Sequence, residues 1–239
     1  MTVRSTGRLT LAIACLAWAT AATAANPPAL KQAFAAAYPK AVVPVRVNDT
    51  ATNRMRFSPA LLVPLPQGRY ALVSKGQNVD DTCHGCDGAY SVAHLKQVGS
   101  RLTLEAPPFA QADSDSGFGA PPKLELFNGL AAEPVLSVRG SHEGMGSVER
   151  WQSLIRLGGD ARATKVAATF PVGLTVRDEH NKLKCAMSAK LAPMAADQSI
   201  TLTYTGALQR QVRYAWSGDR WTARNAVKDM EQLYDFCPK

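Results

Sequence analysis

The stretch that decides the fold is QVRYAW, residues 211–216, which alternates large apolar residues with polar or small ones. Val212, Tyr214 and Trp216 fall on one side of an extended chain, and the residues between them fall on the other. Because successive side chains of a β-strand point to opposite faces, this period of two predicts a strand with one buried face.

Similar short segments precede this strand, and turn-forming sequences such as DEHNK and APMAADQ separate them. The segments are TKVAATF (164–170), VGLTVRD (172–178), KLKCAMSAKL (182–191) and SITLTYTG (199–206). This spacing is typical of a meander. The sequence therefore predicts a mainly β fold, an antiparallel sheet, sandwich or barrel-like meander. We interpret Trp151, Trp216 and Trp221 as core residues of this fold.

A helix is expected at each end of the β region. Residues 28–38 place Leu30 and Phe34 at helical spacing, and Pro39 ends the run. Residues 226–239, AVKDMEQLYDFCPK, repeat apolar residues at the same spacing and predict a short closing helix.

The first half of the β region is less regular. AVVPVRV (41–47) and ALLVPLPQG (60–68) contain prolines and predict edge or irregular segments, since proline cannot donate to a strand ladder. AYSVAHLKQVGSRLTLEA (89–106) predicts a hairpin. Residues 106–122 are rich in Pro, Gly, Ser and Asp, and we interpret them as a long loop that divides one domain or separates two lobes.

Residues 1–25 have the pattern of an export signal: a basic start, an apolar stretch, and the small-residue site Ala22-Thr23-Ala24. Residues 26–239 are then the exported β-rich domain, periplasmic or secreted. No later apolar run is long enough to span a bilayer, so the domain is not expected to span a membrane.

The formal net charge is +8, and it falls to +6 without Arg4 and Arg8 of the signal. The basic residues are spread along the chain and form no block of like charge. This distribution argues against nucleic acid as a partner. We interpret the spread charge as a solvated surface, which leaves the partner open, and the alternative is attraction to anionic envelope polymers or to another exported protein.

The motif CHGC contains Cys83 and Cys86 three positions apart. Covalent haem is excluded because Asp87, not histidine, follows the second cysteine. A thioredoxin-like redox pair would need a helix after the motif, whereas AYSVAHL alternates like a strand. Zinc would need two more ligands from a set that is scattered along the sequence: His84, His94, His180 and Cys185.

A structural disulfide is the favoured interpretation, and redox activity remains an alternative. Signal removal leaves four cysteines, because Cys15 goes with it, and four cysteines allow three pairings. We expect Cys83–Cys86 and Cys185–Cys237, since thiols in an oxidising compartment are more often bridged than metallated.

RGSHEGMGSVERW (139–151) is the other informative stretch, with Ser141, His142 and Glu143 among glycines. It matches neither the zincin motif, because position 146 is Gly, nor the nucleophile elbow, because His142 occupies the serine position. We interpret it as a Gly-rich loop between strands, and as a candidate site loop if the protein is a hydrolase.

CHGC before a strand, followed by FGAPP and MGSVERWQSLIRL, resembles a group of exported bacterial proteins that carry a Cys-His-x-Cys box. The resemblance covers residues 69–157. It implies export and a box that belongs to a β domain, and it implies no activity, cofactor or catalytic residue.

Together these features predict an exported, disulfide-stabilised cell-envelope protein with a non-enzymatic binding or structural role and no cofactor. One alternative is a thiol–disulfide redox protein that uses Cys83 and Cys86. A second is a hydrolase with a site near His142 and Glu143. A strand after Cys86 favours the staple, and a helix there favours redox chemistry.

Overall fold

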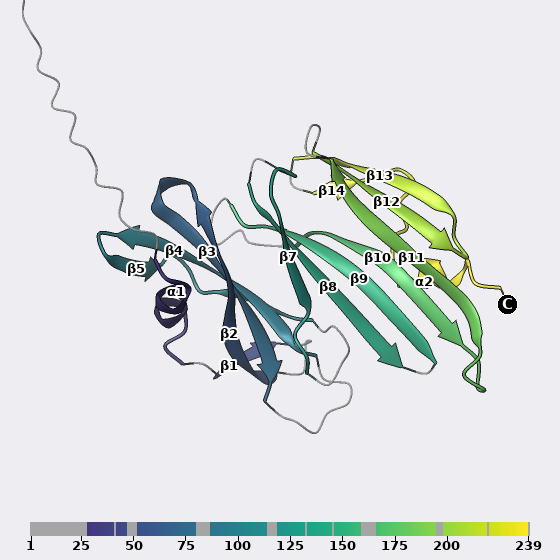
Figure 1. The fold of residues 1–239 in the computed structure, drawn as a ribbon, viewed down its shortest axis with the longest axis horizontal. Helices are drawn as coiled ribbons and strands as arrows, with labels where there is room; N and C mark the ends of the chain where they lie inside the picture. Colours follow the sequence, from purple (N-terminus) through teal and green to yellow (C-terminus); the bar gives the residue numbers. More distant parts are fainter. Residues whose placement is uncertain are drawn as a thin grey trace, which may run out of the picture.

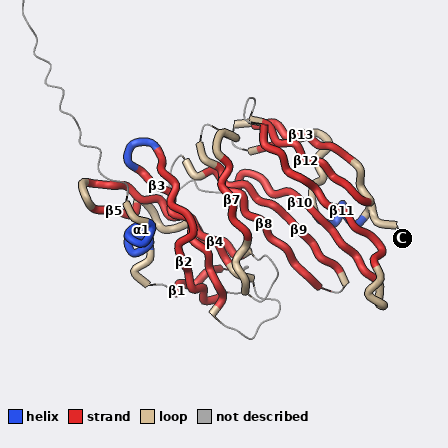
Figure 2. The backbone as a smooth tube through the Cα atoms, in the orientation of Figure 1, coloured by secondary structure: helices blue, strands red, loops and turns tan. Residues whose placement is uncertain are grey.

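The computed structural model describes residues 28–40, 42–46, 52–79, 87–113, 119–131, 133–144, 146–158, 166–194, 198–218 and 220–238. Over these ranges the fold is mainly β, with two antiparallel sheets and two short helices, as the sequence predicts (Figures 1 and 2). The expected signal, residues 1–25, and the pair Cys83 and Cys86 lie outside the described residues.

The first sheet has the strand order β1-β2-β3-β4-β5, and β6 pairs with β4. Its strands are β1 (Val42–Arg46), β2 (Thr52–Leu65), β3 (Arg69–Asn78), β4 (Ala89–Val98), β5 (Arg101–Leu104) and β6 (Phe109–Ala112). β4 and β5 form the predicted hairpin, with Gly99 in the left-handed region at φ 61°. Glycine adopts this conformation without steric cost.

The second sheet is a meander in which each strand pairs with the next along the chain. Its strands are β7 (Lys123–Phe127), β8 (Val135–Gly144), β9 (Ser147–Arg156), β10 (Val166–Arg177), β11 (Leu183–Met194), β12 (Ser199–Gly206), β13 (Arg210–Trp216) and β14 (Trp221–Thr222). QVRYAW forms most of β13. Val212 and Tyr214 are buried there, whereas Gln211 and Arg213 are exposed, which confirms the predicted single buried face.

One face of the first sheet packs against the β7–β9 side of the second sheet, and the remaining strands of the second sheet extend away from it (Figure 1). Separate apolar clusters lie under α1 (Leu30–Ala37) on the first sheet and under the C-terminal segment on the second sheet. Leu72 of β3 packs toward α1, and the next residue, Val73, packs against the second sheet. In β8, Leu136 faces the first sheet, and Val135 faces the core beneath the C-terminal segment. The inner strands are therefore buried on both sides, and apolar residues follow one another without alternation.

The prolines of the first half lie where the ladder does not need their missing N–H. β1 is an edge strand and carries Pro44. It pairs only with residues 52–56 of β2, so Pro59 and Pro64 lie in the part of β2 that pairs with β3 alone. Residues 60–65 therefore have a neighbouring strand on one side only, as predicted for an edge segment. The pairing with β3 shifts register after Pro59.

The segment 106–122 is not entirely a loop. β6 lies within it and pairs with β4, Phe109 opposite Val92 and Ala112 opposite Ala89. The sequence does not predict this strand, because four residues are too few to establish a period of two. The prolines on both sides of it also favour a loop. The chain passes from the first sheet to the second after β6.

The N-terminal helix is confirmed within the predicted range, and it covers the first sheet. Ala33 of α1 is fully buried. After the helix, the Tyr38 hydroxyl hydrogen-bonds to Ser91 Oγ, which in turn donates to the Phe109 carbonyl oxygen at 2.7 Å. This chain of hydrogen bonds joins α1, β4 and β6 and satisfies buried hydroxyl groups.

The C-terminal helix, α2, is shorter than the predicted segment and spans Met230–Tyr234. Asp229 caps it by accepting a hydrogen bond from the Gln232 backbone N–H at 2.9 Å. Leu233 and the preceding Val227 are buried in the core of the second sheet. The cap and these two side chains hold the C-terminal segment on that face.

Cys185 of β11 and Cys237 lie at disulfide distance, as expected, with sulfur atoms 2.09 Å apart. The bridge closes a segment of 52 residues and connects the C-terminal segment to the meander. Cys185 is buried in the same core cluster against which Cys237 packs. The link therefore restrains the segment that covers this core.

Replacing Cys185 and Cys237 together by serine should lower the free energy of unfolding by about 4 kcal/mol in the chain-entropy model. The four-residue ring of a Cys83–Cys86 bridge should contribute less, since the entropy term grows with loop length. Urea unfolding of both double variants measures the difference. A larger loss for the Cys83/Cys86 variant would contradict this order.

Candidate functional site

The stretch 139–151 is a hairpin rather than the predicted Gly-rich loop. β8 continues to Gly144 and β9 begins at Ser147, so its glycines lie mostly within paired strands. His142 pairs directly with Glu149. The prediction failed because glycine density was taken as a sign of a turn, whereas Gly140 has a packing role described below.

The strand geometry separates the residues that the sequence grouped together. Successive side chains of an extended strand point to opposite faces, so His142 faces one way, and Ser141 and Glu143 face the other. His142 lines a cleft next to Asp87 and Trp151. Glu143 lines a different groove. The structure therefore does not bring His142 and Glu143 into one site.

The cleft that contains His142 has a volume of about 360 Å³ and lies where the first sheet meets β8, β9 and β10. Its lining is mostly polar and comes from both sheets: Asp87, Gln111, Ala112, Asp113, His142, Glu149, Trp151, Ser153 and Thr169. We call it the junction cleft. Carboxylates, an imidazole, an amide and an indole meet there, and each of these groups can donate or accept hydrogen bonds to a polar ligand.

One hydrogen bond joins the two sheets in the wall of the junction cleft. The Trp151 indole N–H donates to Asp113 Oδ1 at 3.0 Å, and Asp113 is only 5% exposed. Trp151 pairs with Gly140 across the β8–β9 ladder, and a Cβ at position 140 would collide with both the indole and the carboxylate. Gly140 is thus required for this contact.

Burial raises the pKa of the Asp87 carboxyl, and nearby His142 lowers it by a smaller amount. Burial also raises the pKa of Tyr90, and the Asp113 carboxylate raises it further. The neutral Tyr90 hydroxyl donates to Gln111 Oε1 at 3.0 Å. The Gln111 amide of the cleft wall is thus held in place by a hydrogen bond from the buried Tyr90 hydroxyl.

Glu149 is positioned by a neutral donor from the C-terminal helix. The Tyr234 hydroxyl donates to Glu149 Oε1 at 2.8 Å. Trp151 contributes to the cleft as well, so its interpretation as a core residue is wrong, although Trp216 and Trp221 do pack in the second-sheet core. In the wall of the cleft, the Asp113 carboxylate accepts a hydrogen bond from the Trp151 indole, and the Glu149 carboxylate accepts one from the Tyr234 hydroxyl.

The described residues of the cleft do not assemble a nucleophile. The hydroxyls of Ser153 and Thr169 hydrogen-bond to each other at 2.9 Å. Among the described residues, no hydrogen bond joins His142 to a hydroxyl. A serine nucleophile needs a base within hydrogen-bond reach to activate it. The arrangement is therefore suited to binding through hydrogen bonds.

The proposed zinc ligands outside the box are dispersed. His94 is buried between the sheets, where its Nε2 contacts the Leu157 carbonyl oxygen at 2.8 Å. Cys185 is engaged with Cys237, and His180 lies in the exposed turn after β10. The described part of the chain contains no group of three or more His, Cys, Asp or Glu side chains arranged to hold a metal.

The segment after the Cys-His-x-Cys box is a strand. Asp87 and Gly88 lead directly into β4, and the Gly88 carbonyl oxygen accepts from the Asp113 backbone N–H at 3.0 Å. A helix N-terminus that would lower a cysteine pKa therefore does not follow Cys86. Asp87 directly follows Cys86 in the sequence and lines the junction cleft, so the box and the cleft are connected through this residue.

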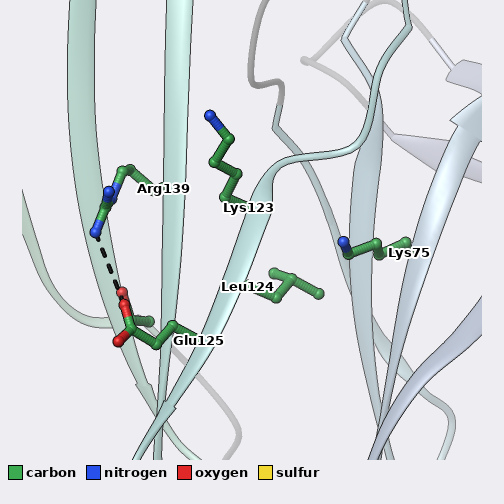
Figure 3. Close-up of a pocket in the computed structure, with 6 residues that line it drawn as sticks. Lys75, Lys123, Leu124, Glu125 and Arg139 are labelled. Atoms are coloured by element: carbon green, nitrogen blue, oxygen red, sulfur yellow. Dashed lines mark ion pairs between the residues drawn. The ribbon is translucent and has the colours of Figure 1, made fainter.

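A second groove lies around the edge strand β7 and also has a volume of about 360 Å³ (Figure 3). It is lined by residues of both sheets: Lys75, Lys123, Leu124, Glu125, Ser137 and Arg139. We call it the basic groove, since it contains three cationic side chains and one carboxylate. Arg139 and Glu125 form an ion pair at 3.7 Å.

Of the residues that line these two sites, the sequence singled out His142 alone as a candidate. Asp113, Trp151 and Lys75 belong to segments far apart in the chain, and no local motif connects them. Asp113 belongs to the segment 106–122, which we interpreted from the sequence as a long loop.

Replacing Gly140 by Ala should destabilise the fold by about 1–3 kcal/mol, because the added methyl forces the Trp151 indole from Asp113. A shift in tryptophan emission should accompany the loss of stability in thermal unfolding. Gly173→Ala is the matched control, since its Cβ would meet neighbours at an ordinary 3.5 Å. Equal stability of both variants would contradict a packing role for Gly140.

Replacing Asp87 by Asn should raise the melting temperature at about pH 7 and leave it unchanged at about pH 3, where the carboxyl is protonated in both states. The raised pKa means that ionising Asp87 costs stability as pH rises through the unfolded and then the folded pKa. Thermal unfolding at both pH values checks this. A less stable Asn variant at neutral pH would show that the carboxylate is stabilised in the fold.

None of the helices within the described ranges is long and apolar enough to cross a bilayer.

Comparison of the chain with protein-family models, with curated proteins and with solved structures finds no significant match.

Proposed function

We propose that this protein is an exported, disulfide-stabilised protein of the cell envelope, periplasmic or secreted, with a non-enzymatic binding role. The signal-like residues 1–25 support export. The disulfide geometry of Cys185 and Cys237 supports an oxidising compartment, since such bridges are rare where thiols are kept reduced. The resemblance to exported proteins with a Cys-His-x-Cys box agrees with this proposal.

The observation that carries the binding role is the Asp113–Trp151 hydrogen bond in the wall of the junction cleft. It fixes a buried carboxylate and an indole from different sheets, so the site is organised before a ligand arrives. Glu149 is fixed in the same way by Tyr234. A ligand that donates hydrogen bonds through hydroxyl or amino groups fits these acceptors.

Two other functions have less support. The strand after Cys86 favours a structural disulfide over a redox pair, because no helix dipole lowers the thiol pKa there. A hydrolase would need His142 to act with a nucleophile or with Glu143. Glu143 lies on the opposite face of β8, and the cleft hydroxyls hydrogen-bond to each other.

The test uses full-length protein expressed in a Gram-negative host, recovered from the periplasm and titrated with neutral and amino-substituted oligosaccharides. Binding is followed by tryptophan emission and calorimetry. N-terminal sequencing should find Ala25 or Asn26 first. Asp113→Asn should weaken binding about tenfold, because the lost acceptor is charged, whereas exposed Asp235→Asn should leave it unchanged.

Retention of the protein in the cytoplasm would contradict export. A failure of every hydroxyl- or amine-bearing probe to bind, or an equal loss in the Asp235 control, would contradict the assignment of the cleft. Release of products from a bound oligosaccharide, abolished by His142→Gln, would replace the binding role with the hydrolase alternative.

A further inference from the structure

We propose that the basic groove is a second binding site, and that it holds a linear polyanion with phosphate or carboxylate groups along its chain. The groove shares no residue with the junction cleft, so this inference stands independently of the cleft's ligand. Three observations support it: an ammonium without an ion-pair partner, a weakly neutralised guanidinium, and a buried hydroxyl proton.

Lys75 is the first of these. It extends from β3 toward β7, as Figure 3 shows, and its side chain is half-buried. Within the described ranges, Lys75 forms no ion pair. A partly desolvated ammonium is stabilised when an anion approaches it, so this position favours a negatively charged ligand.

Arg139 is the second. Its ion pair with Glu125 is long, at 3.7 Å, and both side chains are about half exposed, at 49% and 57%. Exposed pairs of this kind contribute little to stability. Arg139 is also directly opposite Lys123 in the β7–β8 ladder, and like charges in that position repel. The Arg139 guanidinium can therefore exchange Glu125 for a ligand oxyanion at a small cost in free energy. The planar guanidinium also matches the geometry of a phosphate or carboxylate group.

Ser137 is the third. The residue is 1% exposed and lines the groove. Its Oγ accepts from Gln152 Nε2 at 2.7 Å. In the part of the chain that the structure describes, no acceptor takes the Ser137 hydroxyl proton. A ligand oxygen in the groove would accept it and remove the cost of a buried donor without a partner.

The arrangement of the cations favours a chain over a single anion. Figure 3 shows Lys75 on one side of β7 and Arg139 on the other, with Lys123 extending between them. One phosphate group cannot contact cations on both sides of a strand, whereas a polymer that crosses the β7 edge can. The ligand would thus touch both sheets and stabilise their packing.

The experiment measures binding of fluorescent polyphosphate and poly-α-glutamate to the full-length exported protein. Two polymers separate phosphate from carboxylate as the source of the oxyanion. Binding should be seen at about 50 mM NaCl and weaken strongly at about 300 mM, as expected for counterion-linked association. At equal total phosphate, orthophosphate should not displace polyphosphate.

Lys75→Gln with Arg139→Gln should weaken binding about tenfold, since both changes remove charge-assisted contacts. Lys182→Gln with Lys184→Gln is the matched control, because it removes the same charge from exposed positions far along the chain. The control should change affinity less than about twofold, as expected of non-specific screening. Polymer should raise the melting temperature of the wild type and the control, but not of the groove variant.

An equal loss in both double variants would show that net charge alone binds the polymer, and it would overturn the groove. Failure of both polymers to bind at low salt would do the same. Displacement by orthophosphate would overturn the linear ligand. If the double groove variant does not fold, Lys75→Gln and Arg139→Gln are tested singly, and unchanged affinity in both would contradict the proposal.

Discussion

Burial of apolar side chains between the two sheets is the interaction on which the rest of the structure depends. Val73 and Val92 from the first sheet meet Leu136, Val138 and Ile155 from the second. A fully buried side chain of this type contributes about 1.5–3 kcal/mol relative to an exposed one. The polar contacts between the sheets, such as Asp113–Trp151, depend on this packing for their alignment.

The same double burial explains how far the sequence could predict the fold. QVRYAW lies near the end of the meander with one face exposed, so its alternation is visible and its strand was predicted correctly. β4 and β8 are covered on both faces, and there the alternation is lost. Glycine misled the prediction at Gly140, where it accommodates an indole instead of a turn.

The candidate sites were less accessible to sequence reasoning. His142 was identified, but it was grouped with Glu143 by proximity along the chain, and the strand geometry places the two on opposite faces. Asp113 and Trp151 are 38 positions apart. Lys75 and Arg139 come from different sheets. Contacts of this kind depend on how the sheets pack, which a local pattern cannot specify.

The nearest-neighbour order of the second sheet has a consequence for how the chain folds. From β7 to β14, each strand pairs with the next along the chain, so every pairing requires closure of a short connection only. The entropic cost of loop closure is low for such contacts, and local topology favours rapid folding. The first sheet follows the same order from β1 to β5, so we expect both sheets to form by successive addition of hairpins before they pack together.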